Sequence, residues 1–155
     1  MKGAFAHERR PLFRMPVHPA WLLAIFAGGA IGTALRAIIS ALYPHTPAQF
    51  PWATFAINTA GSLILGALLE YLSVSGPDQG WRRFVRLGVG TGVLGGFTTY
   101  SSFAVEAISA VADGAARIGV VYALASPVVG VAAALAGLTV ARSIFQATEQ
   151  HRNNQ

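Results

Sequence analysis

The chain has 155 residues, of which 54% are hydrophobic and only 11% are charged, and its formal net charge is +5. Soluble domains carry roughly 25% charged residues, so this composition excludes an ordinary soluble domain and indicates an all-α integral membrane protein. The sequence contains no cysteine, which excludes disulfide bonds and thiolate chemistry. A membrane-spanning helix takes about 20 residues, so four spans would use nearly the whole chain. Because the resulting bundle would be thin, we expect it to form an oligomer.

Residues 1–18 form a basic tail, and we expect the chain to retain it, since the apolar run that follows is too long for a signal peptide. That run predicts a first membrane helix over residues 19–42. Within it, Gly28 and Gly32 are four positions apart, which allows another backbone to approach closely. Arg36 is the one charged residue of this span. It either reaches the membrane interface or faces inward and helps an anion to enter.

The second predicted span covers residues 52–72. Its polar residues Thr54, Asn58 and Ser62 are spaced four apart and therefore share one face of the helix. An amide in this position is costly to bury without a partner. Asn58 therefore either hydrogen bonds to a neighbouring helix or donates into a pore.

The third predicted span, residues 84–111, is a poor helix at its centre. Five glycines lie within residues 88–96, and each glycine in a helix interior costs about 1 kcal/mol relative to alanine. Four hydroxyl residues follow within residues 98–102. Inside a bilayer a helix breaks only where protein or a polar cavity covers the freed backbone groups. We therefore expect an interruption between residues 95 and 102 at mid-membrane, with a functional centre there, because freed carbonyl oxygens suit ions.

The fourth predicted span covers residues 118–140, and a polar tail covers residues 143–155, so that the transmembrane domain is residues 19–142. Tyr122 and Ser126 share one face of this last span. Nine Lys and Arg residues lie in the two tails and the second loop, and only two lie on the other side. This asymmetry favours cytoplasmic termini.

The polar residues allow three classes of function to be weighed. An enzyme is not expected, because the four histidines lie in tails or loops and no nucleophile with a base can be recognised. A proton-coupled exporter needs a central carboxylate, for which Glu106 is the single candidate. Passive anion conduction suits uncharged hydroxyl and amide donors, which replace hydration without binding too tightly. The central donors are of this kind: Asn58, Ser62, Thr98, Thr99, Ser101, Ser102 and Ser126.

Two aromatic residues, Tyr100 and Phe103, accompany these donors. The edge of an aromatic ring carries partial positive charge, so both rings could face an anion. Ordinary packing or interfacial anchoring is the alternative interpretation.

Three motifs in chain order resemble the bacterial fluoride channel family: Gly28, Gly32 and Arg36 in the first span, FAINTAGSLILG around Asn58, and GGFTTYSSF at residues 95–103. The resemblance covers the chain from Trp21 to Arg142. It implies a fluoride-selective channel in the bacterial inner membrane, crossing it several times, which lets fluoride leave the cell passively and so reduces its toxicity. The runner-up is a small proton-coupled four-helix multidrug exporter.

The resemblance also implies an antiparallel homodimer in contact with membrane lipid, with a structural sodium ion at its centre. By position, the sodium would be held by the backbone carbonyls of Gly95 and Thr98. Arg36 and Glu106 match charged positions of the family, with a role in anion entry or structure. The fluoride pathway would comprise Asn58, Ser62, Thr99, Tyr100, Ser102, Phe103, Tyr122 and Ser126.

The chain departs from the family pattern at two positions. Tyr100 stands where phenylalanine is usual, so its hydroxyl either donates to the anion or blocks the path. Gly130 stands where some members have a second serine, which predicts a shorter polar track. The charge asymmetry opposes insertion in both orientations, although the motifs favour it.

Overall fold

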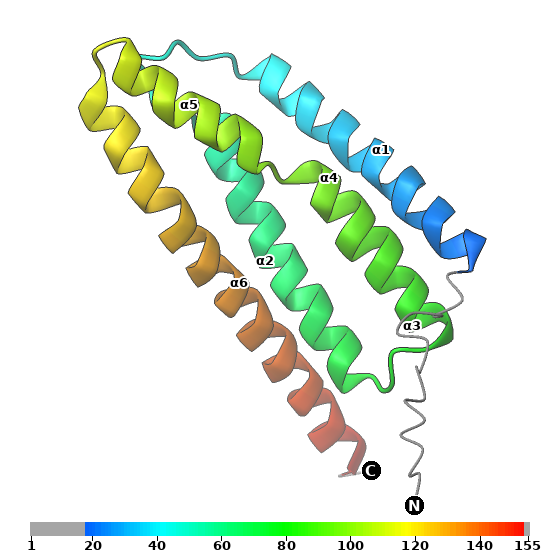
Figure 1. Ribbon diagram of the computed structural model, residues 1–155. Helices are drawn as coiled ribbons and strands as arrows, with labels where there is room; N and C mark the ends of the chain where they lie inside the picture. Colours follow the sequence, from blue (N-terminus) through cyan, green and yellow to red (C-terminus); the bar gives the residue numbers. More distant parts are fainter. Residues whose placement is uncertain (1–17, 154–155) are drawn as a thin grey trace, which may run out of the picture.

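The computed structural model describes residues 18–153, and all regular elements in this part of the chain are helices (Figure 1). The three long helices are α1 (Pro19–Leu42), α2 (Trp52–Val74) and α6 (Ala116–Asn153). Each of them is long and apolar enough to cross a membrane. The four shorter segments between α2 and α6 are α3 (Gly80–Val85), the π-helical η1 (Arg86–Leu94), α4 (Gly95–Phe97) and α5 (Tyr100–Ala112).

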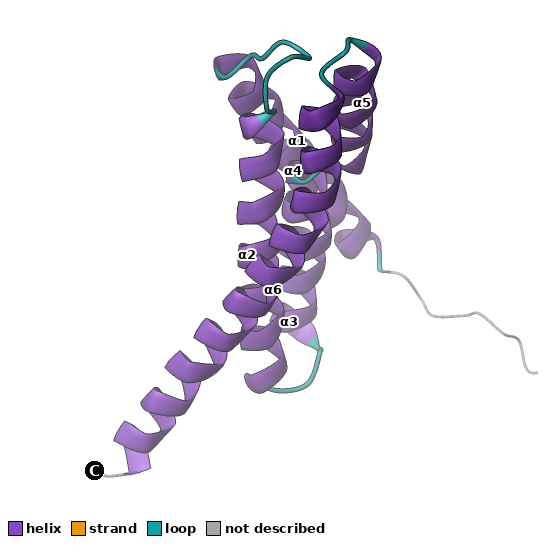
Figure 2. Ribbon diagram, turned by 90° about the vertical axis from the view of Figure 1, so that its left-hand side faces the viewer, coloured by secondary structure: helices purple, strands orange, loops and turns teal. Residues whose placement is uncertain are grey.

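The predicted helix bounds agree closely at α1 and differ most at the C-terminus. The helix α1 has the predicted limits, and α2 ends two residues beyond the predicted Leu72. The helix α6 continues through Asn153, so residues 143–153 of the predicted polar tail are helical. Figure 2 shows this part of α6 extending past the end of α2. The predicted N-terminal tail lies outside the described residues except for His18, whose side chain caps α1 by accepting from the amide of Ala20.

Glycine lets α1 pack directly against η1. Gly28 and Gly32 are both buried, and a Cβ at Gly28 would collide with the carbonyl oxygen of Gly88. A Cβ at Gly32 would likewise collide with the carbonyl oxygen of Val93. The prediction of a close backbone approach at this pair is therefore confirmed.

The glycine-rich stretch is helical, and the interruption comes after it. The chain is π-helical from Arg86 to Leu94 and α-helical to Phe97. Thr98 and Thr99 are then extended, with φ/ψ of −73/157 and −148/126 degrees, before α5 starts. The interruption thus lies within the predicted interval but spans two residues, because the flanking glycines and serines keep helical backbone geometry.

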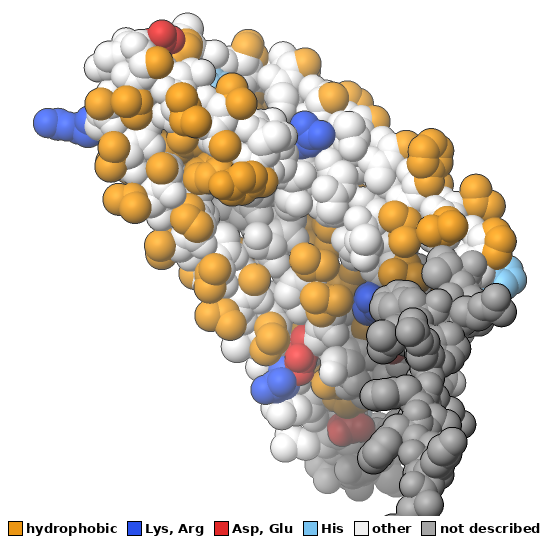
Figure 3. All heavy atoms as spheres, viewed as in Figure 1, with side chains coloured by type: hydrophobic (Ala, Val, Ile, Leu, Met, Phe, Trp, Pro, Cys, Tyr) orange, Lys and Arg blue, Asp and Glu red, His pale blue; other side chains and the backbone are white. Residues whose placement is uncertain are grey.

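Most large apolar side chains lie on the outside of the described helices. Among residues 18–153 the fully buried large side chains are Ile57 and Tyr122, whereas Phe26 is 78% exposed and Val128 is 68% exposed. Figure 3 shows hydrophobic side chains spread over the visible face of the molecule. A surface of this kind is unstable in water and suits lipid or a second protein copy.

Candidate functional site

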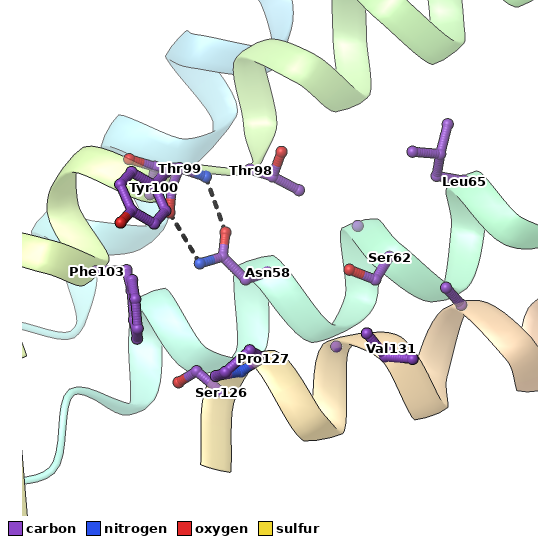
Figure 4. Close-up of a pocket in the computed structure, with 13 residues that line it drawn as sticks. Asn58, Ser62, Leu65, Thr98, Thr99, Tyr100, Phe103, Ser126, Pro127 and Val131 are labelled. Atoms are coloured by element: carbon purple, nitrogen blue, oxygen red, sulfur yellow. Dashed lines mark hydrogen bonds between the residues drawn. The ribbon is translucent and has the colours of Figure 1, made fainter. Parts of the chain in front are cut away.

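A cavity of about 460 Å³ lies where α2 and α6 face the interruption between α4 and α5 (Figure 4). Its lining includes six of the eight residues that the sequence assigned to the pathway: Asn58, Ser62, Thr99, Tyr100, Phe103 and Ser126. Thr98, which was assigned to the sodium site, also lines it. The remaining lining is apolar or glycine. Three segments far apart in the sequence therefore place uncharged donors around one hollow.

Asn58 holds the interruption by pairing with the backbone of Thr99. Its Nδ2 donates to the Thr99 carbonyl oxygen at 2.9 Å, and the Thr99 amide donates to Asn58 Oδ1 at 2.8 Å. A buried backbone group left without a partner costs about 1–3 kcal/mol, so this pair stabilises the extended conformation. Asn58 therefore forms hydrogen bonds to a neighbouring segment, which is the first of the two interpretations given above. The second hydrogen of its amide group remains available to a ligand in the cavity.

The side chain of Thr99 caps the N-terminus of α5. Its Oγ1 accepts from the amide of Ser102 at 3.1 Å, which is an N-cap of α5. The same oxygen lies 3.2 Å from the Ser101 and Ser102 hydroxyls. Ser102 therefore belongs to the cap, and it is absent from the cavity lining.

These bonds deprive the two predicted sodium ligands of their usual helical partners. The Thr99 amide would pair with the Gly95 carbonyl in a continuous helix, but it donates to Asn58 instead. The Ser102 amide would pair with the Thr98 carbonyl, but it donates to Thr99 Oγ1. Gly95 is exposed. Hard cations prefer oxygen ligands, so the carbonyl oxygens of Gly95 and Thr98 fit a sodium ion.

Arg36 places a positive charge at the carboxyl end of α4, just before the interruption. Its Nε donates to the carbonyl oxygen of Gly96 at 3.1 Å, and Thr33 Oγ1 reaches the same oxygen at 3.5 Å. A cation at the carboxyl end of a helix is favourable because of the helix dipole. Arg36 therefore turns inward to the protein and does not reach for the interface, and sequence reasoning missed this partner 60 positions away.

The aromatic residues form a row that leads out of the cavity. Phe103 lies between Tyr100 and Tyr122, with ring centroids 5.9 and 5.2 Å away. Tyr122 also packs edge-on against Phe50 at 5.3 Å. Tyr100 is 80% exposed and Tyr122 is buried. Phe103, the middle ring of the row, therefore connects the cavity to the protein interior.

Glu106 is the centre of a hydrogen-bonded cluster beyond this row. Thr54 Oγ1 donates to its Oε1 at 2.6 Å, and the Tyr122 hydroxyl donates to its Oε2 at 2.8 Å. His45 Nε2 lies 4.0 Å from Oε1. Sequence reasoning identified Glu106 as the single candidate carboxylate but missed these partners, which come from α2, α6 and the loop between α1 and α2.

The cavity contains donors and no charged side chain. The Ser126 hydroxyl is shielded from solvent and makes no hydrogen bond within residues 18–153. No group of three or more His, Cys, Asp or Glu residues that could hold a metal occurs in the described range. Uncharged donors of this kind suit a small anion in transit.

Comparison with known proteins gives consistent matches along the chain. The family model described as "CrcB-like protein, Camphor Resistance (CrcB)" matches residues 23–138. The "Fluoride-specific ion channel FluC 2" of Leifsonia xyli is 48% identical over 137 residues, covering 88% of this chain and 94% of that protein. The "Fluoride-specific ion channel FluC 1" of Cutibacterium acnes is 42% identical, covering 82% and 89%. The corresponding protein of Agrobacterium fabrum is 39% identical, covering 78% and 95%.

Proposed function

The chain belongs to the CrcB-like protein family, whose members are membrane transporters rather than enzymes, and from this premise we propose that it is a fluoride-selective channel of the bacterial inner membrane. In this proposal fluoride moves passively out of the cell, down its electrochemical gradient, and its toxic concentration in the cytoplasm falls. The names of the similar proteins support fluoride as the ion.

The observation that carries the proposal is the cavity lining. Asn58 has donor capacity that its protein contacts leave unused, and Ser126 and the aromatic ring of Phe103 also line the cavity. A fluoride ion would give up water molecules and accept these donors in their place. The absence of a cation in the lining keeps the ion from binding too tightly to leave.

We further propose that the segments from α3 to α5 together act as the third of four membrane spans, broken at mid-membrane. The extended residues Thr98 and Thr99 mark the break. Two copies would associate in an antiparallel homodimer, with a structural sodium ion between the carbonyl oxygens of Gly95 and Thr98 of each copy. The exposure of Gly95 and the loss of the helical partners of both carbonyls support this arrangement.

Fluoride release from liposomes tests the proposal. Vesicles that contain the purified protein and potassium fluoride are placed in fluoride-free buffer, and a potassium ionophore is added without a pH gradient. We expect rapid fluoride release, measured with a fluoride electrode, because a channel needs only the ion's own gradient. Release at the rate of empty vesicles, together with dye uptake driven by a pH gradient, would instead identify a proton-coupled multidrug exporter.

A further inference from the structure

A second hollow lies at the opposite end of the bundle from the loop between α1 and α2. It has a volume of about 310 Å³ and lies between the end of α2, the following loop, α3 and η1. Its polar lining consists of Ser73, Asp78, Arg82 and Arg86. Because it lies at the end of the membrane-spanning helices, it is at the level of the lipid headgroups.

The single carboxylate of this hollow is already engaged. Arg86 binds Asp78 with two hydrogen bonds, from Nε at 3.0 Å and from Nη2 at 2.8 Å. These bonds hold the pKa of Asp78 below its usual range, so this carboxylate is ionised at neutral pH. Arg83 Nε lies 3.5 Å from the same carboxylate. One negative charge therefore faces two arginines.

Arg82 supplies a third positive charge that nothing in the described chain neutralises. No ion pair joins it to residues 18–153, and its Nε is shielded without a hydrogen bond. Gly76, with φ of 130 degrees, lets the guanidinium lie against the loop, since a Cβ there would be 3.1 Å from Arg82 Cζ. The cluster of three arginines and one aspartate has two excess positive charges.

Two tryptophans place this cluster at the membrane interface. The guanidinium of Arg82 lies 5.5 Å from the ring of Trp81, and that of Arg83 lies 5.1 Å from the ring of Trp21. Tryptophan is enriched at the level of the headgroups, and basic pockets there bind anionic lipids. We propose that this hollow binds the phosphate of an anionic phospholipid, with Arg82 as the principal ligand.

The charge of the cluster selects among lipids. A zwitterionic headgroup would bring its own cation next to the excess positive charge, whereas a phosphatidylglycerol headgroup brings only its phosphate. The free N–H groups of Arg82 match phosphate oxygens in geometry and charge. The site is separate from the cavity at the helix break and does not depend on fluoride conduction.

Fluorescence quenching by brominated lipids tests this assignment. In the Trp52→Phe background only Trp21 and Trp81 remain, and each lies against one arginine of the cluster. The full chain is placed in phosphatidylcholine vesicles with a small share of brominated phosphatidylglycerol or brominated phosphatidylcholine. We expect the anionic lipid to be enriched about fivefold around the tryptophans, the effect of one basic side chain near a lipid phosphate. Arg82→Gln should abolish the preference.

Arg117→Gln is the matched control, because Arg117 is exposed at the start of α6, far from the hollow. It should leave the preference unchanged. Equal quenching by the two brominated lipids in the unmodified background would overturn the proposal, and so would a preference that survives Arg82→Gln. If millimolar inorganic phosphate changed the fluorescence while the lipids remained equivalent, the ligand would be a soluble phosphate and the lipid assignment would be wrong.

Discussion

Asn58 and Thr99 exchange two hydrogen bonds across 41 positions of sequence, at 2.9 and 2.8 Å. The pair does two things at once. It satisfies the backbone where the helix is interrupted, and it fixes an amide group on the wall of the cavity. The helix break and the proposed ion path therefore depend on the same side chain.

Replacement of Asn58 by Asp should slow fluoride release by at least tenfold. The carboxylate keeps an acceptor for the Thr99 amide but loses the donor to the Thr99 carbonyl, and it places a negative charge beside the path. Fluoride efflux from liposomes measures the effect. Asn58→Gln is the control, because it keeps the amide group and its lack of charge but changes the position of that group. Unchanged fluoride flux in the Asp variant would show that Asn58 has a purely structural role.

Phe103→Ile should also reduce fluoride release, because isoleucine keeps much of the volume but removes the ring that lines the cavity. Tyr100→Phe is the comparison, since it retains the ring and removes only the hydroxyl of an 80% exposed side chain. We expect the Phe variant to conduct at close to the original rate. If Phe103→Ile conducted equally well, the aromatic row would be a packing feature.

Gly28→Ala should destabilise the protein, because the added methyl group would meet the carbonyl oxygen of Gly88 on η1. The expected loss is about 1–3 kcal/mol, as for other overpacked contacts. Gly29→Ala is a matched control on the same helix, since a Cβ there meets nothing within 4 Å. Unfolding in a detergent titration measures both variants. Equal stabilities would show that α1 and η1 pack less closely than described.

Tyr122→Phe should lower the free energy of unfolding by about 1.5–3 kcal/mol, the range for a hydrogen bond to a charged group. The change removes the 2.8 Å bond to Glu106 and retains the buried ring. Tyr71→Phe, on a side chain that is 50% exposed, is the control and should have little effect. A Tyr122→Phe variant as stable as the original would mean that the Glu106 cluster does not contribute to stability.

Exchange of sodium for a bulky organic cation should weaken the proposed dimer, because the carbonyls of Gly95 and Thr98 would lose their ion. The measurement is the dimer fraction by single-molecule photobleaching at constant ionic strength. Gly95→Ala provides a second approach: its Cβ would meet nothing within 4 Å among the residues that the structure describes but would crowd the proposed interface. A dimer fraction that responds to neither change would argue against a sodium ion at this position.

The sequence predicted those features that depend on local patterns. The apolar run predicted the limits of α1, the spacing of Gly28 and Gly32 predicted its close packing, and the glycines and hydroxyl residues predicted the interval of the interruption. The hydroxyl and amide pattern also identified the polar part of the cavity lining.

What the sequence left open depends on contacts between distant segments. Arg36 meets Gly96 across 60 positions, and Glu106 meets Thr54 across 52. No periodicity within one helix reveals such partners. Contacts between distant segments also explain why the glycine-rich stretch is helical. Close packing of α1 against η1 offsets the low helix propensity of glycine.

The most direct test of the central claim compares fluoride with chloride in the same vesicles. Liposomes that contain the protein are loaded with equal concentrations of both ions, and two ion-selective electrodes record their release after addition of a potassium ionophore. We predict that fluoride leaves at least a hundredfold faster than chloride, because the uncharged donors that line the cavity replace the hydration of the smaller ion better. Equal release of the two ions would contradict a fluoride-selective channel.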